Sequence, residues 1–346
     1  MIPTSKDLTI ISVYHNRLSG RLLRLNGEIT RRLNPDAEVR WLVGDNTPPG
    51  FPVQDKITGG GFTVIPNPHD YKGRGSHQHA GAINLCLSRV STRFVMSLDS
   101  DFYILQPEWI ERILSHMQEN NLAFFGVTYH PEEYVKYRYF PSVVCVIIDL
   151  SRVRREDIDF TPEHTFAASG RAVTVNKKTR EKRIFRKRVR HMAARGYMNG
   201  IFRLKRMFDF SARRGMIGSA RDTSYAIFRR YGSDPSFGRE YVQAVFDPAH
   251  DPHLATMLPL RFNALFERLL PDRLCYIPKR RDAYTPVGFR ARGFPDCGGY
   301  GWEEYIWNNT PFGIHIRGSK TWKRNESEDG EFELIRKTVA QFAWGS

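Results

Sequence analysis

Two acidic residues, Asp99 and Asp101, are separated by a single residue and follow directly after an apolar stretch at residues 93–98. That stretch is typical of a buried β-strand, so both carboxylates are expected at the end of a strand. Carboxylates at the carboxyl edge of a parallel sheet can hold a hard divalent cation. Such a cation can clamp a diphosphate and neutralise its charge as it leaves. The alternative is a solvated acidic turn, so the surrounding elements decide between the two interpretations.

The first 150 residues alternate apolar stretches with amphipathic helical patterns. Strands are predicted at residues 9–13, 39–43, 62–65, 93–98, 123–127 and 142–149, and helices at 18–33, at 80–90 and from Pro107 onward. Strands that alternate with helices predict an α/β fold with a mostly parallel sheet covered on both faces. Ligands bind such sheets beyond the carboxyl ends of the strands, so the residues that follow each strand are the candidate site.

Four segments of this region form a series, in which three end strands and one lies in a helix and contains Asn84. The four segments are residues 10–16 (IISVYHN), 41–45 (WLVGD), 79–84 (HAGAIN) and 95–101 (VMSLDSD). In order and spacing they resemble the GT-A glycosyltransferases, especially the large inverting group called family 2, over roughly residues 8–150. The resemblance implies a GT-A fold, which is a Rossmann-like nucleotide-binding sheet with helices on both faces.

The resemblance also implies roles on the donor side of the site. The donor would be a nucleotide sugar, with a UDP-sugar favoured by family frequency, and the cofactor would be Mn²⁺ or Mg²⁺. The implied donor-binding residues are Tyr14 and His15 against the base or ribose, Asp45 on the nucleobase, Asn84, and Asp99 near the ribose or donor sugar, with Asp101 as a metal ligand. His15 departs from many relatives at its position, and for Asp45 the alternative is a cap of the turn after a strand.

A late histidine, His315, lies in a short apolar stretch before a Gly-Ser turn with two cations, Arg317 and Lys320. By resemblance to several GT-A enzymes, His315 would be a further metal ligand and the two cations would contact the departing diphosphate. Imidazole and carboxylates together suit Mn²⁺ as well as Mg²⁺. The alternative for a lone histidine in an apolar stretch is a structural role.

Asp222 opens a helix predicted over residues 222–231, at a place where inverting relatives present an acidic residue as catalytic base. A base is needed because an acceptor hydroxyl is a poor nucleophile until its proton is removed. The alternative, which does not exclude the first, is that Asp222 caps the helix. Reserve candidates for the base are Asp234, Glu240, Glu303 and Glu304.

Positive charge is concentrated in one segment. The chain of 346 residues has a formal net charge of +15, and residues 171–214 hold sixteen Lys or Arg against two acidic residues, a net charge of +14. We therefore expect a nucleotide-sugar-binding α/β half at 1–165, a basic insertion on the acceptor side at 166–215, and an acceptor-binding and C-terminal part at 216–346. The cations expected to form an anion-binding surface are Lys182, Arg183, Arg186, Lys187, Arg188 and Arg190.

The charge of the basic insertion indicates what kind of acceptor the protein would bind. Clustered Lys and Arg suit an anionic membrane surface or a phosphate backbone, and a solvated excursion without a ligand is the third alternative. The first hypothesis is a metal-dependent inverting transferase that acts on a hydroxyl of an anionic or membrane-linked glycan, such as a lipid-linked glycan. The second is a glycosyltransferase for hydroxymethylated bases of DNA. The third is a non-catalytic nucleic-acid-binding protein.

Several classes of protein are disfavoured. The longest uncharged apolar stretch, residues 139–148, is about half of the roughly 20 residues that a membrane span needs. The N-terminal residues lack a signal-peptide core, so a cytosolic protein is expected, with peripheral binding at the inner membrane surface as an option.

The four cysteines, Cys86, Cys145, Cys275 and Cys297, have no zinc-ligand spacing, so reduced thiols and no zinc are expected. No Walker-type or Rossmann glycine spacing occurs, and the oligomeric state stays open.

Overall fold

A computed structural model describes residues 3–67, 75–129, 137, 140–162, 223–244, 302–308, 310–316 and 328–344. Several sequence predictions lie outside these residues, among them the catalytic base Asp222, the late cations Arg317 and Lys320, and the basic insertion at 166–215.

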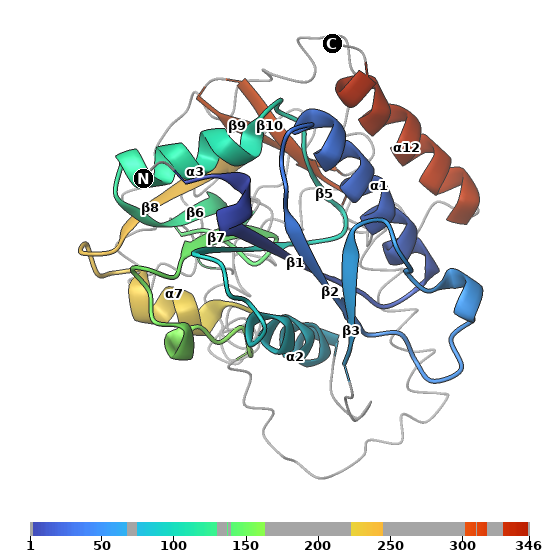
Figure 1. The fold of residues 1–346 in the computed structure, drawn as a ribbon, viewed down its shortest axis with the longest axis horizontal. Coiled ribbons are helices and arrows are strands. Elements are labelled where there is room, and N and C mark those ends of the chain that lie inside the picture. The colour runs from blue at the N-terminus through green and yellow to red at the C-terminus, as the bar shows by residue number, and fades with distance from the viewer. Residues whose placement is uncertain are drawn as a thin grey trace, which may run out of the picture.

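Within the described residues, ten strands form one sheet in the order β3-β2-β1-β4-β7-β6-β8-β9-β10-β5 (Figure 1). Their bounds are β1 Leu8–Tyr14, β2 Arg40–Asp45, β3 Phe62–Pro66, β4 Phe94–Leu98, β5 Phe102–Ile104, β6 Leu122–Val127, β7 Cys145–Asp149, β8 Gly238–Ala244, β9 Glu303–Trp307 and β10 Thr310–His315. The first four strands in this order pair in parallel, which brings the ends of β1, β2 and β4 to one edge.

Helices cover both faces of the sheet, as the α/β prediction requires. Their bounds are α1 Arg17–Leu33, α2 Gly75–Leu87, α3 Trp109–Glu119, α7 Tyr225–Tyr231 and α12 Glu328–Trp344. In Figure 1, α1, α3 and α12 lie above the sheet, and α2 and α7 lie below it. Alternate side chains of β1 enter the two corresponding cores, with Ile10 on the α1 side and Ile11 on the α2 side. Every residue of β1 is therefore buried.

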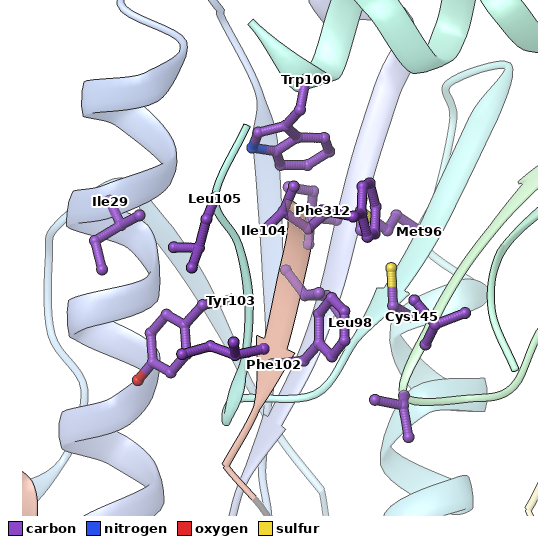
Figure 2. Close-up of a cluster of buried hydrophobic side chains, with 14 of the residues drawn as sticks. Ile29, Met96, Leu98, Phe102, Tyr103, Ile104, Leu105, Trp109, Cys145 and Phe312 are labelled. Carbon is purple, nitrogen blue, oxygen red and sulfur yellow. The ribbon is translucent and has the colours of Figure 1, made fainter. Parts of the chain in front are cut away.

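The core on the α1 side includes residues just before and just after the acidic turn. Figure 2 shows Met96 and Leu98 of β4, Phe102 of β5, Cys145 of β7 and Phe312 of β10 in one apolar cluster. Phe102 is fully buried, and its ring centroid lies 6.3 Å from that of Phe312. Burying one large aromatic side chain stabilises a fold by about 1.5–3 kcal/mol, so this cluster fixes β5 against β10.

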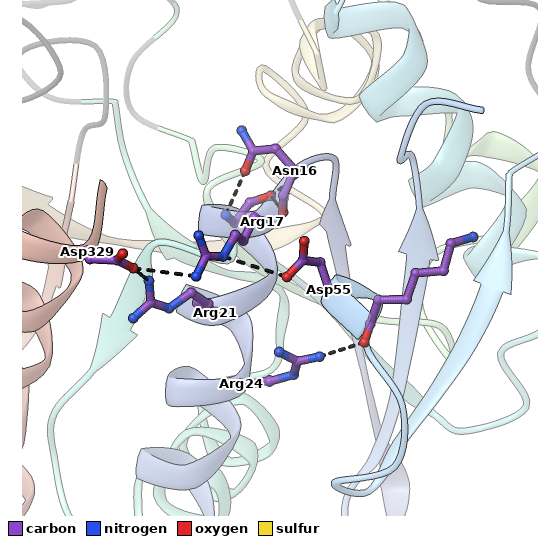
Figure 3. A network of polar contacts seen from close by, with 8 residues as sticks. Asn16, Arg17, Arg21, Arg24, Asp55 and Asp329 are labelled. Atoms are coloured by element: carbon purple, nitrogen blue, oxygen red, sulfur yellow. Dashed lines mark hydrogen bonds and ion pairs between the residues drawn. The ribbon is translucent and has the colours of Figure 1, made fainter. Parts of the chain in front are cut away.

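The C-terminal helix α12 packs beside α1, which the sequence did not predict. Arg21 of α1 donates a hydrogen bond to the Asp329 carboxylate, and its guanidinium lies 3.9 Å from the ring centroid of Phe332. Figure 3 shows Arg17 between Asp329 and Asp55, with nitrogen–oxygen distances of 3.6 Å to each. The helix is therefore held to α1 by buried apolar residues and by ion pairs on its exposed side.

Three features differ from the sequence prediction. Strand β7 runs antiparallel to β4, so the parallel arrangement expected for most of the sheet holds for β3-β2-β1-β4 and for the β6–β8 pair. Strands β5, β8 and β9 were not predicted. The helix predicted to open at Asp222 begins at Tyr225, and its N-cap is Ser224, which has a positive φ of 68°. The predicted start of this helix at residue 222 is therefore wrong by three residues, while Asp222 itself lies outside the described residues.

Two further expectations concern cysteines and membrane spans. Cys86 and Cys145 are buried free thiols, as predicted, while Cys275 and Cys297 lie outside the described residues. Among the described helices, none combines the length and the apolar character needed to cross a membrane.

Candidate functional site

The connection between β4 and β5 carries both acidic residues of the Asp-Ser-Asp motif. It is tight because the Phe102 amide donates to the Asp99 carbonyl over 3.1 Å, while the Asp99 amide donates to the Val144 carbonyl over 2.9 Å. Both carboxylates are half-buried, with side-chain exposures of 21% for Asp99 and 26% for Asp101. The motif is therefore a fixed turn at the edge of the sheet rather than a fully solvated loop.

His315 reaches this turn from the far end of the chain. It is the last residue of β10, which pairs antiparallel with β5 and places His315 opposite Phe102. The Ile316 amide donates to the Asp101 carbonyl over 2.8 Å, so the two backbones are joined beside the acidic turn. The His315 Nε2 atom lies 3.5 Å from Oδ1 of Asp101.

Asp99, Asp101 and His315 together could hold a metal ion. Each offers one ligand atom, and these atoms all lie within 4.8 Å of one another. Two carboxylates and one imidazole fit Mn²⁺ or Mg²⁺. The sequence prediction had Asp101 and His315 as metal ligands and Asp99 on the ribose or donor sugar, and the structure brings all three together. We call these three residues the metal cluster.

The electrostatics of the metal cluster also suit a cation. Burial, followed by the charge of Asp101, raises the pKa of Asp99 to about 8, although His315 counteracts this rise. Burial alone would lower the pKa of His315, but the charge and hydrogen bond of Asp101, together with Glu303, raise it well above 6.5. Two crowded carboxylates are costly to ionise together, and a bound cation relieves that repulsion.

Two more side chains contact the metal cluster. His315 donates from Nδ1 to Oε2 of Glu303 over 2.8 Å, so the carboxylate and Asp101 face opposite nitrogens of the ring. His79, at the start of α2, places Nε2 3.5 Å from Oδ1 of Asp99. The sequence offered Glu303 only as a reserve base and gave His79 no role. No local pattern could have joined Glu303 to His315, because the pairing of β9 with β10 sets that contact.

Asp45 forms a second polar site at the end of β2. Its Oδ1 atom accepts hydrogen bonds from the Thr47 amide at 2.9 Å and the Thr47 hydroxyl at 2.6 Å, so it does cap its turn. The other oxygen, Oδ2, lies 3.5 Å from Nζ of Lys56. Burial raises the pKa of Asp45, but the hydrogen bonds from Thr47 and Tyr14 and the charge of Lys56 together lower it below its usual range, so the group is a carboxylate at neutral pH.

Tyr14 and His15 lie between Asp45 and the metal cluster, because β1 pairs with both β2 and β4. Tyr14 is directly opposite Asp45 in the register, and burial and the Asp45 charge raise its pKa. His15 is exposed, and its Nε2 lies 3.2 Å from Nδ2 of Asn16, which caps α1. The structure therefore brings Tyr14, His15 and Asp45 to the same edge of the sheet as the metal cluster.

Other predicted residues have partners outside the metal cluster. Asn84 donates to Oδ1 of Asp159 over 2.7 Å and accepts from the Phe160 amide, so it holds the segment after β7. Among the reserve bases, Glu240 contacts Nε2 of His116 at 2.7 Å, and Asp234 accepts hydrogen bonds from Ser236. Glu304 is buried in β9, opposite Ile314.

Comparison with known proteins finds a family model that matches one segment of this chain. Residues 59–180 match the model of glycosyl transferase family 2. This range includes α2, β4 and the acidic turn, and the match agrees with the predicted GT-A type of fold. No curated protein shows significant similarity to the sequence.

Several solved structures match part of this chain. TarS residues 1–349 from S. aureus are 15% identical, with 44% of this chain and 50% of that chain covered and a TM-score of 0.32. Mannosyltransferase PcManGT from Pyrobaculum calidifontis, in complex with GDP-Man and Mn²⁺, is 12% identical, with 44% and 48% covered and a TM-score of 0.33. LgtC is 15% identical, with 43% and 60% covered and a TM-score of 0.31. The matched region spans about half the length of the first two.

Proposed function

We propose that this chain, which matches glycosyl transferase family 2 over residues 59–180, is a metal-dependent inverting glycosyltransferase. It would move a sugar from a nucleoside-diphosphate sugar to a hydroxyl of an anionic acceptor. The observation that carries the proposal is the metal cluster. Asp99, Asp101 and His315 lie beside the ends of β1 and β2, where α/β sheets bind nucleotides.

Asp99, Asp101 and His315 would hold Mn²⁺ or Mg²⁺. A divalent cation in this position supplies Lewis-acid stabilisation to a diphosphate leaving group. Asp45 would bind the nucleobase, because Oδ2 accepts hydrogen bonds while Thr47 holds Oδ1 in place. Tyr14 and His15 would line the base and ribose. UDP-sugars are the first donors to test.

Asp222 is the proposed base, and Arg317 and Lys320 are the proposed diphosphate contacts. The described residues that follow Asp222 are firmly held: the Ser224 amide donates to the Phe160 carbonyl over 3.2 Å, and the Tyr129 hydroxyl donates to the Thr223 carbonyl over 3.3 Å. A carboxylate base that removes the acceptor proton supports direct displacement with inversion at the anomeric carbon.

The acceptor is proposed to be anionic, or to sit on an anionic surface, because a net charge of +14 is concentrated in residues 171–214. A lipid-linked glycan at the inner membrane surface is the leading acceptor. Duplex DNA with hydroxymethylated bases is the second, since the same cations suit a phosphate backbone. Both interactions weaken with salt.

The first experiment measures hydrolysis of a panel of nucleotide sugars by the full chain with Mn²⁺. We expect hydrolysis of at least one donor and its loss in Asp101→Ala and Asp99→Ala. If no nucleotide sugar binds in calorimetry while nucleic acid does, the chain is the non-catalytic alternative and the proposal fails.

The second experiment identifies the acceptor surface. The full chain and a variant with Gln at Lys182, Arg183, Arg186, Lys187, Arg188 and Arg190 are titrated with anionic vesicles and with duplex DNA at several salt concentrations. Salt-sensitive binding to vesicles, reduced in the variant, supports the lipid-linked acceptor, and the same result with DNA supports the second. Binding to neither surface contradicts the proposed acceptor class.

A further inference from the structure

Glu303 lies directly across the β9–β10 pair from His315, its partner in the register. Both residues are almost fully buried, with exposed fractions of 5% for Glu303 and 8% for His315. The His315 Nδ1 atom lies 2.8 Å from Oε2 of Glu303. An ionised carboxylate only accepts hydrogen bonds, so this contact fixes the proton of a neutral His315 ring on Nδ1.

The Glu303 carboxylate is itself held in place. Two residues along β9, the hydroxyl of Tyr305 donates to the same Oε2 atom over 3.2 Å. The Tyr305 ring is 1% exposed, and its centroid lies 5.4 Å from that of Phe102, the residue that follows Asp101. Glu303 is therefore fixed to the strand that begins at the acidic turn and has little freedom to turn away from His315.

The orientation of the ring follows from these contacts. With Nδ1 bound to Glu303, the Nε2 atom is the one that lies 3.5 Å from Oδ1 of Asp101. In the neutral ring, Nε2 then carries the lone pair that a metal ion needs. Carboxylates that bind the outer nitrogen of a metal-ligating histidine fix its tautomer and orientation.

We propose that Glu303 is a positioning residue of the metal cluster, which holds His315 with Nε2 directed toward the ion bound by Asp99 and Asp101. The inference rests on the proposed metal site and goes beyond it. It gives Glu303 a role in metal affinity in place of the reserve role as base.

A second histidine–glutamate pair in the structure shows the contrast. His116 of α3 places Nε2 2.7 Å from Oε2 of Glu240 on β8, which is as close as the His315 contact. Its other ring nitrogen, Nδ1, lies 3.2 Å from the side-chain amide of Asn120 rather than beside a carboxylate pair. The His116 pair thus joins α3 to β8, and it serves as a matched control.

The test uses calorimetry to measure the titration of the metal-free full chain with Mn²⁺ alone and with Mn²⁺ plus UDP. We expect Glu303→Gln to raise the Mn²⁺ dissociation constant about 10- to 100-fold. Tyr305→Phe, which leaves every carboxylate and imidazole in place, should raise it by a smaller factor. His116→Gln should leave Mn²⁺ affinity unchanged.

A double-mutant cycle separates positioning from a general structural effect. Because Glu303 acts through His315, the double variant Glu303→Gln/His315→Gln should bind Mn²⁺ no more weakly than His315→Gln alone. Losses that add independently, or wild-type Mn²⁺ affinity in Glu303→Gln, would overturn the inference. If Glu303→Gln does not fold, the Tyr305→Phe variant decides instead. Wild-type Mn²⁺ affinity in Tyr305→Phe would then overturn the inference.

Failure of the inference and failure of the proposed function give different results. If Mn²⁺ binding depends on Glu303 but no nucleotide sugar is hydrolysed, the positioning role stands and the proposed function fails. If nucleotide sugars are hydrolysed with Mn²⁺ and Glu303→Gln binds Mn²⁺ as the wild type does, only the inference fails. A wild-type chain that binds no Mn²⁺ in either titration overturns both.

Discussion

His315 Nε2 and Asp101 Oδ1 lie 3.5 Å apart, although the two residues are 214 positions apart in the sequence. The antiparallel pairing of β10 with β5 brings them together, and the hydrogen bond from the Ile316 amide to the Asp101 carbonyl closes the contact. The geometry of this pair therefore depends on backbone pairing as well as on side-chain chemistry.

Asp101→Asn should remove most of the stabilisation that Mn²⁺ gives to the fold. A ligand at 100 times its dissociation constant stabilises the native state by about 2.7 kcal/mol, so the wild-type melting temperature should rise with Mn²⁺. Loss of a charged ligand should abolish that rise. Differential scanning fluorimetry with and without Mn²⁺ measures it, with the exposed Glu156→Gln as control. A full Mn²⁺ shift in Asp101→Asn would exclude this carboxylate as a ligand.

Asp45→Asn should weaken UDP binding and leave the binding of Mn²⁺ alone unchanged. The amide of asparagine keeps an oxygen for the Thr47 hydrogen bonds. The substitution removes the negative charge that faces Lys56 and that is proposed to bind the nucleobase of the donor. A hydrogen bond to a charged group contributes about 1.5–3 kcal/mol, which corresponds to a loss of roughly 10- to 150-fold in affinity. Calorimetry with UDP measures it, with the exposed Glu38→Gln as control. Unchanged UDP affinity would remove Asp45 from the donor site.

Asp149→Asn should destabilise the fold at neutral pH, and the difference from wild type should shrink in acid. Asp149 is 1% exposed and accepts hydrogen bonds from Arg93 and Ser151. Burial raises the pKa of Asp149, but the bonds from Arg93 and Ser151 outweigh burial and lower it below 3.8. The stabilisation is therefore present above pH 3.8 and is lost as the pH falls through the folded-state pKa.

Urea denaturation measures this effect. At pH 7 the variant should lose about 2 kcal/mol of unfolding free energy, the typical value for a charged hydrogen bond. A pH series down to 3 should narrow the difference between the two proteins, because the loss begins near pH 3.8. A difference that stays constant across the series would show that ionisation of Asp149 is not its cause.

Gly126→Ala should destabilise the sheet strongly. A Cβ atom at position 126 would lie 2.0 Å from the Cys145 carbonyl oxygen and 2.8 Å from the Val146 Cα, both of them backbone atoms of the neighbouring strand β7. Forcing an extra methyl into such a place costs about 1–3 kcal/mol or more. The matched control is Gly81→Ala in α2, where the nearest side-chain atom is 3.9 Å away.

The control variant Gly81→Ala should be as stable as the wild type or more stable by about 0.5–1 kcal/mol, because alanine has a higher helix propensity than glycine. Thermal denaturation of both variants compares them directly. Equal stabilities of Gly126→Ala and Gly81→Ala would contradict the close approach of β6 and β7.

Local sequence patterns predicted much of the fold. Apolar stretches with helical patterns between them correctly gave β1, β2, β3, β4, β6 and β7 together with α1, α2 and α3. The direction of β7 was not readable, because a buried strand has the same pattern whether it pairs parallel or antiparallel. Strand β5 has three residues, too few to show a period, and β9 begins with two glutamates. Pairing with β10 stabilises both.

The sequence by itself determined that two carboxylates follow a buried strand, that Asp45 ends another, and that a net charge of +14 is confined to 44 residues. These are local properties of neighbouring residues. Only the tertiary structure decided that Asp99 shares a cluster with Asp101 and His315, and that Glu303 holds the outer nitrogen of that histidine. The physical reason is that strand pairing across most of the chain's length sets these distances. Such pairing depends on packing between distant segments, which spacing along the chain does not encode.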